Sequence, residues 1–179
     1  RLASAASTLA FSLQDRTQFM KNPILAGSIE QSVSVLPLSN KPHLDGSDEE
    51  WRDMLVHELQ FSKHNHRITL KMGKYRKNIY WYVRVYDDEL VYAHGEAEAA
   101  DNLMVEFIEN TGSRYLMFSA REPGRFNAQI LNPQLQWLKR LDLRITGVWR
   151  EMDDGYALEI AFPVKLTSPL FRLVATDAD

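Results

Sequence analysis

Residues 78–86, which read NIYWYVRVY, constrain the fold more than any other part of the sequence. Apolar residues alternate there with others at the two-residue period of a β-strand, so we expect one purely apolar face to lie against the core. That face consists of Ile79, Trp81, Val83 and Val85. The opposite face consists of Tyr80, Tyr82, Arg84 and Tyr86. A tyrosine ladder of this kind fits cross-strand pairing, and it also fits a platform for flat ligands.

Other stretches with a strand pattern recur along the chain, with turn signals between them. They cover residues 32–38, 67–72, 103–108, 114–120, 143–150, 156–164 and 171–175. The turn signals NTG at 110–112 and DDG at 153–155 join two pairs of these strands into hairpins. Because short strands predominate and helix is scarce, the sequence predicts a mainly β fold, namely an antiparallel β-sandwich.

The first 22 residues have a different pattern, in which apolar residues recur at three- and four-residue steps. The recurring residues include Leu2, Ala6, Leu9 and Leu13. The Asn-Pro pair at 22–23 is a stop signal, because the residue before a proline avoids helical backbone angles. We therefore predict an N-terminal helix of the membrane-proximal type at 1–22 and a β-sandwich domain at 23–179.

The segment 43–51, HLDGSDEEW, precedes the densest run of strand signals. Its Asp-Gly pair at 45–46 is a turn signal, because aspartate can bond its own backbone and glycine tolerates positive φ. The serine or aspartate that follows can cap a short helical turn. Trp51 then places a large ring where the chain turns toward the core. We interpret the segment as a tight turn with a core tryptophan, and favour this over direct chemistry there.

Composition excludes several classes of function. The chain has 21 Lys and Arg residues mixed with 24 Asp and Glu residues, and its net charge is −3, which argues against a nucleic-acid partner. It has no cysteine, so disulfides, thiolate zinc sites and cysteine nucleophiles are excluded. No apolar run is long enough to span a bilayer. Because the chain begins at Arg1, we expect it to be a piece of a longer protein.

Signals for catalysis and for metal binding are sparse. His64 and His66 are two residues apart, and His94 lies near Glu96 and Glu98, but we interpret both groups as solvated loops. No nucleophile, base and orienting residue can be named together, so we expect the domain itself to be non-catalytic. Calcium is the one metal that the loop aspartates and carbonyls suit, with no ligand set identified.

The stretch 121–140 contains turn signals and basic residues, and we predict it to be irregular. Loops on a rigid scaffold often carry binding, and this one combines planar donors, an amide and rings. The predicted ligand-binding residues are Arg121, Arg125, Phe126, Asn127 and Trp137. Arginine forks suit carboxylates and rings suit the apolar face of a sugar, so an acidic saccharide is the expected ligand. Alternatively, Phe126 and Trp137 anchor a long loop to the core and the arginines are solvated.

Four pieces of the sequence occur in an order that is typical of one family. They are LDGSDEEW at 44–51, IYWYVRVYDD at 79–88, DNLMVEFIEN at 101–110 and GYALEIAFPVKL at 155–166. With these pieces the chain resembles, over about residues 33–175, the family 9 carbohydrate-binding modules and the related sugar-binding-like sensory domains. The resemblance implies a β-sandwich that is often extracytoplasmic and often binds saccharide or calcium. Four aspartates match the family pattern and can equally shape turns: Asp45, Asp87, Asp88 and Asp101.

The stretch LQDRTQFM at 13–20 resembles a membrane-exit helix, as in bacterial membrane histidine kinases that carry such a module in the periplasm. The resemblance implies a periplasmic ligand-sensing domain of an inner-membrane protein in a two-component system, with a small molecule or saccharide as ligand. The full-length protein would be membrane-anchored, could be a sensor histidine kinase and could form a homodimer. The alternative is a carbohydrate-binding module of a secreted polysaccharide-degrading enzyme.

Overall fold

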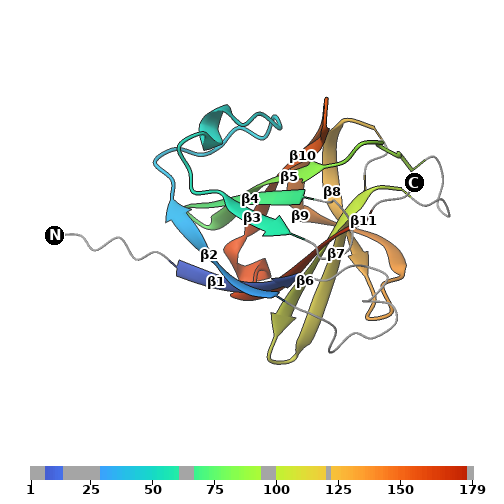
Figure 1. Cartoon of the computed structure of the whole chain (residues 1–179). Coiled ribbons are helices and arrows are strands. Elements are labelled where there is room, and N and C mark those ends of the chain that lie inside the picture. Colours follow the sequence, from blue (N-terminus) through green and yellow to red (C-terminus); the bar gives the residue numbers. More distant parts are fainter. Residues whose placement is uncertain (1–6, 14–28, 61–66, 94–99, 120–121, 177–179) are drawn as a thin grey trace.

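The computed structural model describes residues 7–13, 29–60, 67–93, 100–119 and 122–176. Within these ranges the chain forms eleven β-strands and two short 3₁₀ helices (Figure 1). The strands are β1 (Ser7–Leu13), β2 (Ile29–Pro37), β3 (His57–Gln60), β4 (Arg67–Tyr75), β5 (Asn78–Tyr86), β6 (Asn102–Glu109), β7 (Gly112–Ser119), β8 (Gly124–Leu131), β9 (Trp137–Met152), β10 (Gly155–Pro163) and β11 (Leu170–Thr176). The 3₁₀ helices are η1 (Glu49–Trp51) and η2 (Val164–Leu166).

These strands belong to one mixed sheet, in the order β2-β1-β11-β6-β7-β8-β9-β10-β5-β4-β3. Neighbours in this order run antiparallel, except that β1 runs parallel to β11. A further parallel pairing joins Leu36 and Pro37 of β2 to Gly73 and Lys74 of β4, so the sheet curls back on itself. The predicted mainly β fold is confirmed. The strands form one curled mixed sheet, whereas we predicted an antiparallel sandwich.

The prediction of an N-terminal helix is wrong over residues 7–13, which form β1. β1 pairs antiparallel with β2 and parallel with β11, so its backbone is bonded on both sides. The helical spacing had a second interpretation, because Leu9, Phe11 and Leu13 also alternate at the period of a strand. Residues 1–6 and 14–22 of the predicted helix lie outside the described residues. Within the described ranges, no helical segment has the length and apolar character needed to cross a membrane.

Most of the predicted strands are present. β5 begins and ends where the sequence pattern does, at Asn78 and Tyr86. The predicted hairpins are β6–β7 and β9–β10: β6 and β7 pair antiparallel along their length, and β10 pairs antiparallel with residues 146–152 of β9. These agreements follow from strong alternation between clear turn signals, which fixes both the limits and the register of a strand.

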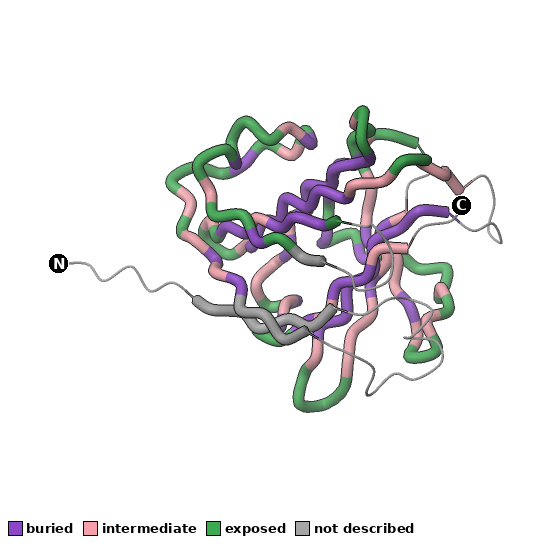
Figure 2. The backbone as a smooth tube through the Cα atoms, viewed as in Figure 1, coloured by how far each residue is buried: buried purple, intermediate pink, exposed green. Residues whose placement is uncertain are grey.

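The main core lies on the inner face of the curled sheet, as the buried residues along the central strands show (Figure 2). The predicted inward face of β5 is confirmed, because Ile79, Val83 and Val85 are buried with Trp81. The Trp81 ring contacts Phe162 and Phe171, with ring centroids 4.8 and 4.7 Å apart. These rings pack at inclined angles, which aromatic pairs prefer to face-to-face stacking.

The outer face of β5 is also buried, by the segment 43–51. Tyr80 is 1% exposed and Tyr82 is 4% exposed, and Trp51 stacks on Tyr82 with ring centroids 5.9 Å apart. Burial is the largest cause that raises the pKa of Tyr82, to about 12. Tyr80 and Tyr82 therefore pack under this segment, so the tyrosine ladder does not form an open ligand platform at these two residues.

The stretch 121–140, which we predicted to be irregular, contains β8 and the beginning of β9. The pairing of these two strands shifts register twice, between Asn127 and Ala128 and between Gln129 and Leu131. Such β-bulges insert unpaired residues into a strand and interrupt the two-residue period that a sequence pattern reveals. The sequence does alternate over 125–130, with Phe126, Ala128 and Ile130 on one face, but the prediction gave more weight to the turn signals at 123–124 and 132–133.

Candidate functional site

The five predicted ligand-binding residues do not converge on one surface. Arg121 lies outside the described residues. Along β8, Arg125 and Asn127 lie on the face opposite Phe126, as the alternation of a strand requires. Phe126 packs against the main core, with its ring centroid 5.4 Å from that of Phe118. Its ring also fills the space where a side chain at Gly147 would stand.

Asn127 and Trp137 are each held by the backbone of β9. The Asn127 amide donates a hydrogen bond to the Ile145 carbonyl at 3.1 Å. The Trp137 indole N–H donates to the Arg140 carbonyl at 3.4 Å. Trp137 is half-buried and packs in a second apolar cluster, on the outer face of the sheet. The buried members of this outer cluster are Met104, Leu131 and Val174, and its partly buried members are Tyr115, Met117, Leu135 and Trp137. A binding role for the five residues stays a prediction.

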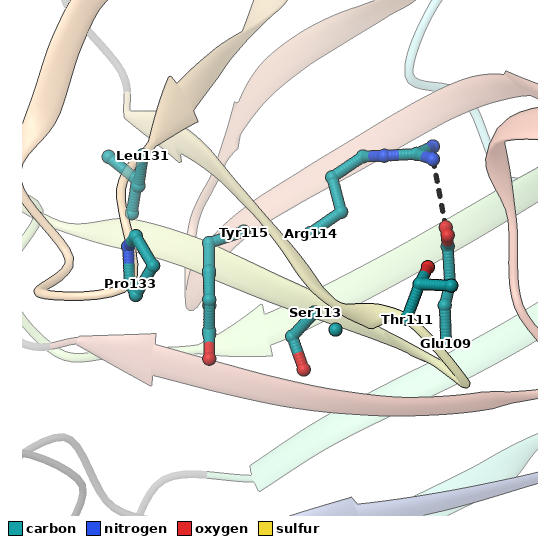
Figure 3. A pocket seen from close by; sticks show the side chains of 8 residues that line it. Glu109, Thr111, Ser113, Arg114, Tyr115, Leu131 and Pro133 are labelled. Carbon is teal, nitrogen blue, oxygen red and sulfur yellow. Dashed lines mark hydrogen bonds and ion pairs between the residues drawn. The ribbon is translucent and has the colours of Figure 1, made fainter.

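A surface pocket adjoins this outer cluster at the tip of the β6–β7 hairpin, and we call it the hairpin groove (Figure 3). Its volume is about 290 Å³. It is lined by Glu109, Thr111, Gly112, Ser113, Arg114, Tyr115, Leu131 and Pro133. Tyr115 and Leu131 belong to both the groove and the outer cluster, so the structure brings Trp137 into the neighbourhood of the groove.

The charges in the hairpin groove are balanced and held in place. The Arg114 guanidinium lies 2.8 Å from the Glu109 carboxylate, and Figure 3 shows it directed toward that group. Its other terminal nitrogen donates to the Leu166 carbonyl of η2 at 2.7 Å. Burial, together with the Glu106 carboxylate, raises the pKa of Tyr115, so its phenol keeps its proton near neutral pH. The groove thus offers hydroxyls, one ion pair and an aromatic ring, without an unbalanced charge.

A second concentration of polar contacts lies under the segment 43–51, around Glu159. This side chain is fully buried, and its Oε2 accepts the backbone N–H groups of Asp45 at 2.9 Å and Gly46 at 3.0 Å. Its Oε1 accepts the indole N–H of Trp51 at 2.9 Å. Burial raises the pKa of Glu159, and the three donors partly offset that effect. Because all of these bonds are internal, the cluster fixes the segment and leaves no open site.

Three of the four aspartates that match the family pattern accept hydrogen bonds from backbone N–H groups. The Asp101 carboxylate accepts the Val91 N–H at 2.7 Å, and the Asp45 carboxylate accepts the Ser47 N–H at 2.7 Å. Asp87 accepts the Glu89 N–H at 3.3 Å, and Asp88 is exposed. The described part of the chain holds no group of three or more His, Cys, Asp or Glu residues that could bind a metal ion. His64, His66 and His94 lie outside the described residues.

Comparison with known proteins gives a fold and no sequence match. Neither a scan against protein-family models nor a search of curated proteins finds a match. Among solved structures, a family 9 carbohydrate-binding module from Caldicellulosiruptor kristjanssonii in complex with glucose matches with a TM-score of 0.54 and 16% identity, covering 80% of this chain and 78% of that one. The chain has the fold of such a module. A family 9 module of the same organism in complex with cellotriose gives a TM-score of 0.48 and 15% identity, over 72% and 66% of the two chains.

Sequence reasoning missed the hairpin groove, because it treated the NTG turn at 110–112 as a connection only. The alternation of Ser113 and Tyr115 with Arg114 and Leu116 does place two hydroxyl-bearing side chains on one face. That signal identifies a polar edge on β7. It does not reveal Leu131, the last residue of β8, or Pro133, which follows that strand, and both residues complete the groove.

Proposed function

We propose that this chain is a non-catalytic saccharide-binding domain, and that the sugar binds in the hairpin groove. The observation that carries the proposal is the lining of this groove, which combines the Tyr115 ring and hydroxyl groups on one face of β7 with the charge-balanced Arg114–Glu109 pair on the other face. A sugar presents hydroxyls at its edges and C–H groups on its faces. A site for it therefore needs hydrogen-bonding groups beside an apolar ring. The fold shared with a module whose structure contains glucose supports the same conclusion.

The size and charge of the groove favour a neutral sugar. A volume of about 290 Å³ lies near the lower limit for small-molecule sites, which suits one or two sugar rings. Arg114 and Glu109 form charge-assisted hydrogen bonds with each other, and each can still bond a sugar hydroxyl. Leu131 and Pro133 give the groove an apolar wall beside Tyr115.

Titration calorimetry with glucose and cellotriose tests the proposal. We expect the wild type to bind at least one of the two, and Tyr115→Ala to weaken that binding at least tenfold, or about 1.4 kcal/mol. Tyr86→Ala is the matched control, because Tyr86 is a half-buried tyrosine on β5 and does not line the groove. The proposal fails if the folded wild type binds neither sugar, or if both variants weaken binding equally.

At the level of the full-length protein, we propose an extracytoplasmic sensor domain of a membrane-anchored bacterial signalling protein, such as a sensor histidine kinase. The four matching sequence pieces support this role. The alternative is a module of a secreted polysaccharide-degrading enzyme. The flanking gene sequence separates them, because membrane helices with a kinase core support the first and a hydrolase domain supports the second. Analytical ultracentrifugation tests the proposed homodimer. Calcium binding is tested by comparing the melting temperature of the domain in calcium with that in a chelator.

A further inference from the structure

The turn between β4 and β5 and the helix η2 border a second pocket, which we call the basic pocket. Its volume is about 600 Å³. Its lining includes Lys74, Arg76, Lys77 and Lys165, together with Asn78 and Pro163. Among the described residues, no carboxylate lines this pocket or forms an ion pair with any of its four cations. The pocket is therefore strongly positive, on a chain whose net charge is −3.

Backbone hydrogen bonds hold the cationic residues together. The Val164 N–H of η2 donates to the Lys77 carbonyl at 2.9 Å, which fixes η2 beside the turn. The Leu38 N–H donates to the Lys74 carbonyl at 2.9 Å, which fixes the end of β4. Four like charges repel one another, so stability alone does not favour gathering them at one place. The rigid backbone keeps a positive site preformed before any anion arrives.

The backbone conformation of Arg76 is unfavourable for a residue that has a side chain. Its φ is 52°, in the left-handed region that glycine and asparagine adopt more readily. It is the first residue of a two-residue hairpin turn in which the second residue, Lys77, does not have positive φ, and glycine is preferred at the first position of such a turn. Its guanidinium carbon lies 5.2 Å from the centroid of the Tyr75 ring, a cation–π contact that orients the side chain. Strained residues concentrate at functional sites, which makes Arg76 a candidate for a functional residue of this pocket.

We propose that the basic pocket is a second ligand site, which binds an oligosaccharide through carboxylate or sulfate groups. The guanidinium group of Arg76 can bind a carboxylate or sulfate group with two parallel hydrogen bonds, and the lysines add positive charges around it. The Asn78 amide can bond a sugar hydroxyl. A concave pocket of this size suits a short chain of charged sugars, whereas a flat lipid surface would meet only its rim.

This site is independent of the hairpin groove and differs from it in charge. In the groove, Glu109 neutralises Arg114, so a neutral sugar is the suitable ligand. In the basic pocket the described residues supply no counter-charge, so the ligand itself must be the anion. Binding of an anionic sugar at the basic pocket does not require that the groove bind anything.

Calorimetry at low and high salt provides the test, with tetragalacturonate and a sulfated tetrasaccharide as anionic probes. Cellotetraose, inorganic phosphate and phosphatidylglycerol vesicles are the comparison probes. We expect the wild type to bind at least one anionic tetrasaccharide, more weakly as salt rises, and to bind it in the presence of cellotetraose. The proposal is overturned if neither anionic tetrasaccharide binds, if phosphate alone binds as tightly, or if only the vesicles bind.

Two triple variants with equal loss of charge locate the site. The pocket variant is Arg76→Asn, Lys77→Gln and Lys165→Gln, and the control is Lys41→Gln, Arg52→Gln and Arg140→Gln, all at exposed positions. We expect the pocket variant to weaken anion binding at least tenfold and the control to change it less than about twofold. Equal losses would show that net charge alone attracts the anion. Tyr115→Ala separates the two sites, because it should leave anion binding unchanged.

Arg76→Asn alone gives a second readout. Asparagine tolerates the left-handed backbone, so the variant should raise the melting temperature by about 2 °C while it weakens anion binding. If the variant melts at a higher temperature and binds the anion more weakly, unfolding cannot be the cause of the weaker binding. Unchanged anion affinity in this variant would remove Arg76 from the site.

Discussion

Two regions of the chain in which we predicted no strand carry one tryptophan each, but they are held in different ways. In the Trp51 segment (43–51), the indole is 1% exposed and donates to Glu159, 108 residues away. In the Trp137 stretch (122–140), the indole is half-buried and donates to the Arg140 carbonyl, three residues away. The first region is fixed by one long-range carboxylate, and the second by local pairing of two bulged strands.

The difference separates a region that stabilises the fold from one that leaves side chains accessible. The Trp51 segment buries its ring against the outer face of β5. Along β9, in and just after the Trp137 stretch, the side chains of Leu138, Leu141 and Leu143 are 45%, 47% and 72% exposed. Packing that depends on one buried group tolerates little change, whereas a bulged strand with exposed side chains can vary without loss of the core.

Glu159→Ala should have the largest effect on this comparison. It leaves the N–H groups of Asp45, Gly46 and Trp51 without their acceptor, and should lower the free energy of unfolding by about 3–5 kcal/mol. Urea denaturation measures the loss, and Glu159→Gln, which keeps one carbonyl acceptor, should lose less. A loss below about 1 kcal/mol in Glu159→Ala would mean that the carboxylate does not hold the Trp51 segment.

Trp51→Phe should have the next largest effect. Phenylalanine keeps an aromatic ring over Tyr82 but removes the N–H donor to Glu159, so we expect a loss of about 1–3 kcal/mol. The double variant with Glu159→Ala should lose less than the sum of the two single losses, because both changes remove the same bond. Additive losses in urea melts would show that the two residues act separately.

Trp137→Ala should cost less than the removal of a fully buried tryptophan. Its ring is half-buried at the edge of the outer cluster, so we expect a loss of about 1–2 kcal/mol. Thermal melts measure the loss, with Trp81→Ala as the buried reference at about 3–5 kcal/mol. If Trp137→Ala costs as much as Trp81→Ala, the Trp137 stretch is as rigid as the core and the contrast between the two regions disappears.

The smallest expected effect concerns His57, on the strand that follows the Trp51 segment. Its Nε2 accepts the Ser34 N–H at 3.2 Å, and burial lowers its pKa below the ordinary 6.5. The bond needs the neutral ring, so its contribution is complete above about pH 6.5 and is lost as the pH falls toward the lowered pKa. We expect the wild type to lose about 0.5–1 kcal/mol more than His57→Gln between pH 7.5 and 5.5. Equal losses in denaturant melts at the two pH values would contradict this.

Local patterns were sufficient for the strands that alternate regularly, as β5 and the β9–β10 hairpin show. They were not sufficient for Glu159, because alternation with Leu158 and Ile160 places it on the outer face, where a carboxylate usually meets water. It is buried only because the Trp51 segment covers that face. A contact across more than 100 residues has no signature in either local stretch.

Both candidate sites required the tertiary structure for the same reason. The hairpin groove combines the tip of β6–β7 with Pro133 after β8, and the basic pocket combines the β4–β5 turn with Lys165 of η2. The sequence predicted the turn of the β6–β7 hairpin and the beginning of β5 at Asn78, but neither the β4–β5 turn nor the distant residues that lie beside these elements. β1 was misassigned for a related reason, because its partners, β2 and β11, decide between two periodicities that its residues satisfy equally.

The parallel pairing of β1 with β11 has a mechanical consequence. The two strands pair from Ala10↔Leu170 to Leu13↔Leu173. Tension applied to the chain before β1 and after β11, in opposite directions, would load this ladder in shear, so its hydrogen bonds would have to break together. At a hairpin pulled from its open end, they would instead break one at a time. Because Phe171 belongs both to this ladder and to the aromatic core, a load on the ladder would also reach the ring of Trp81.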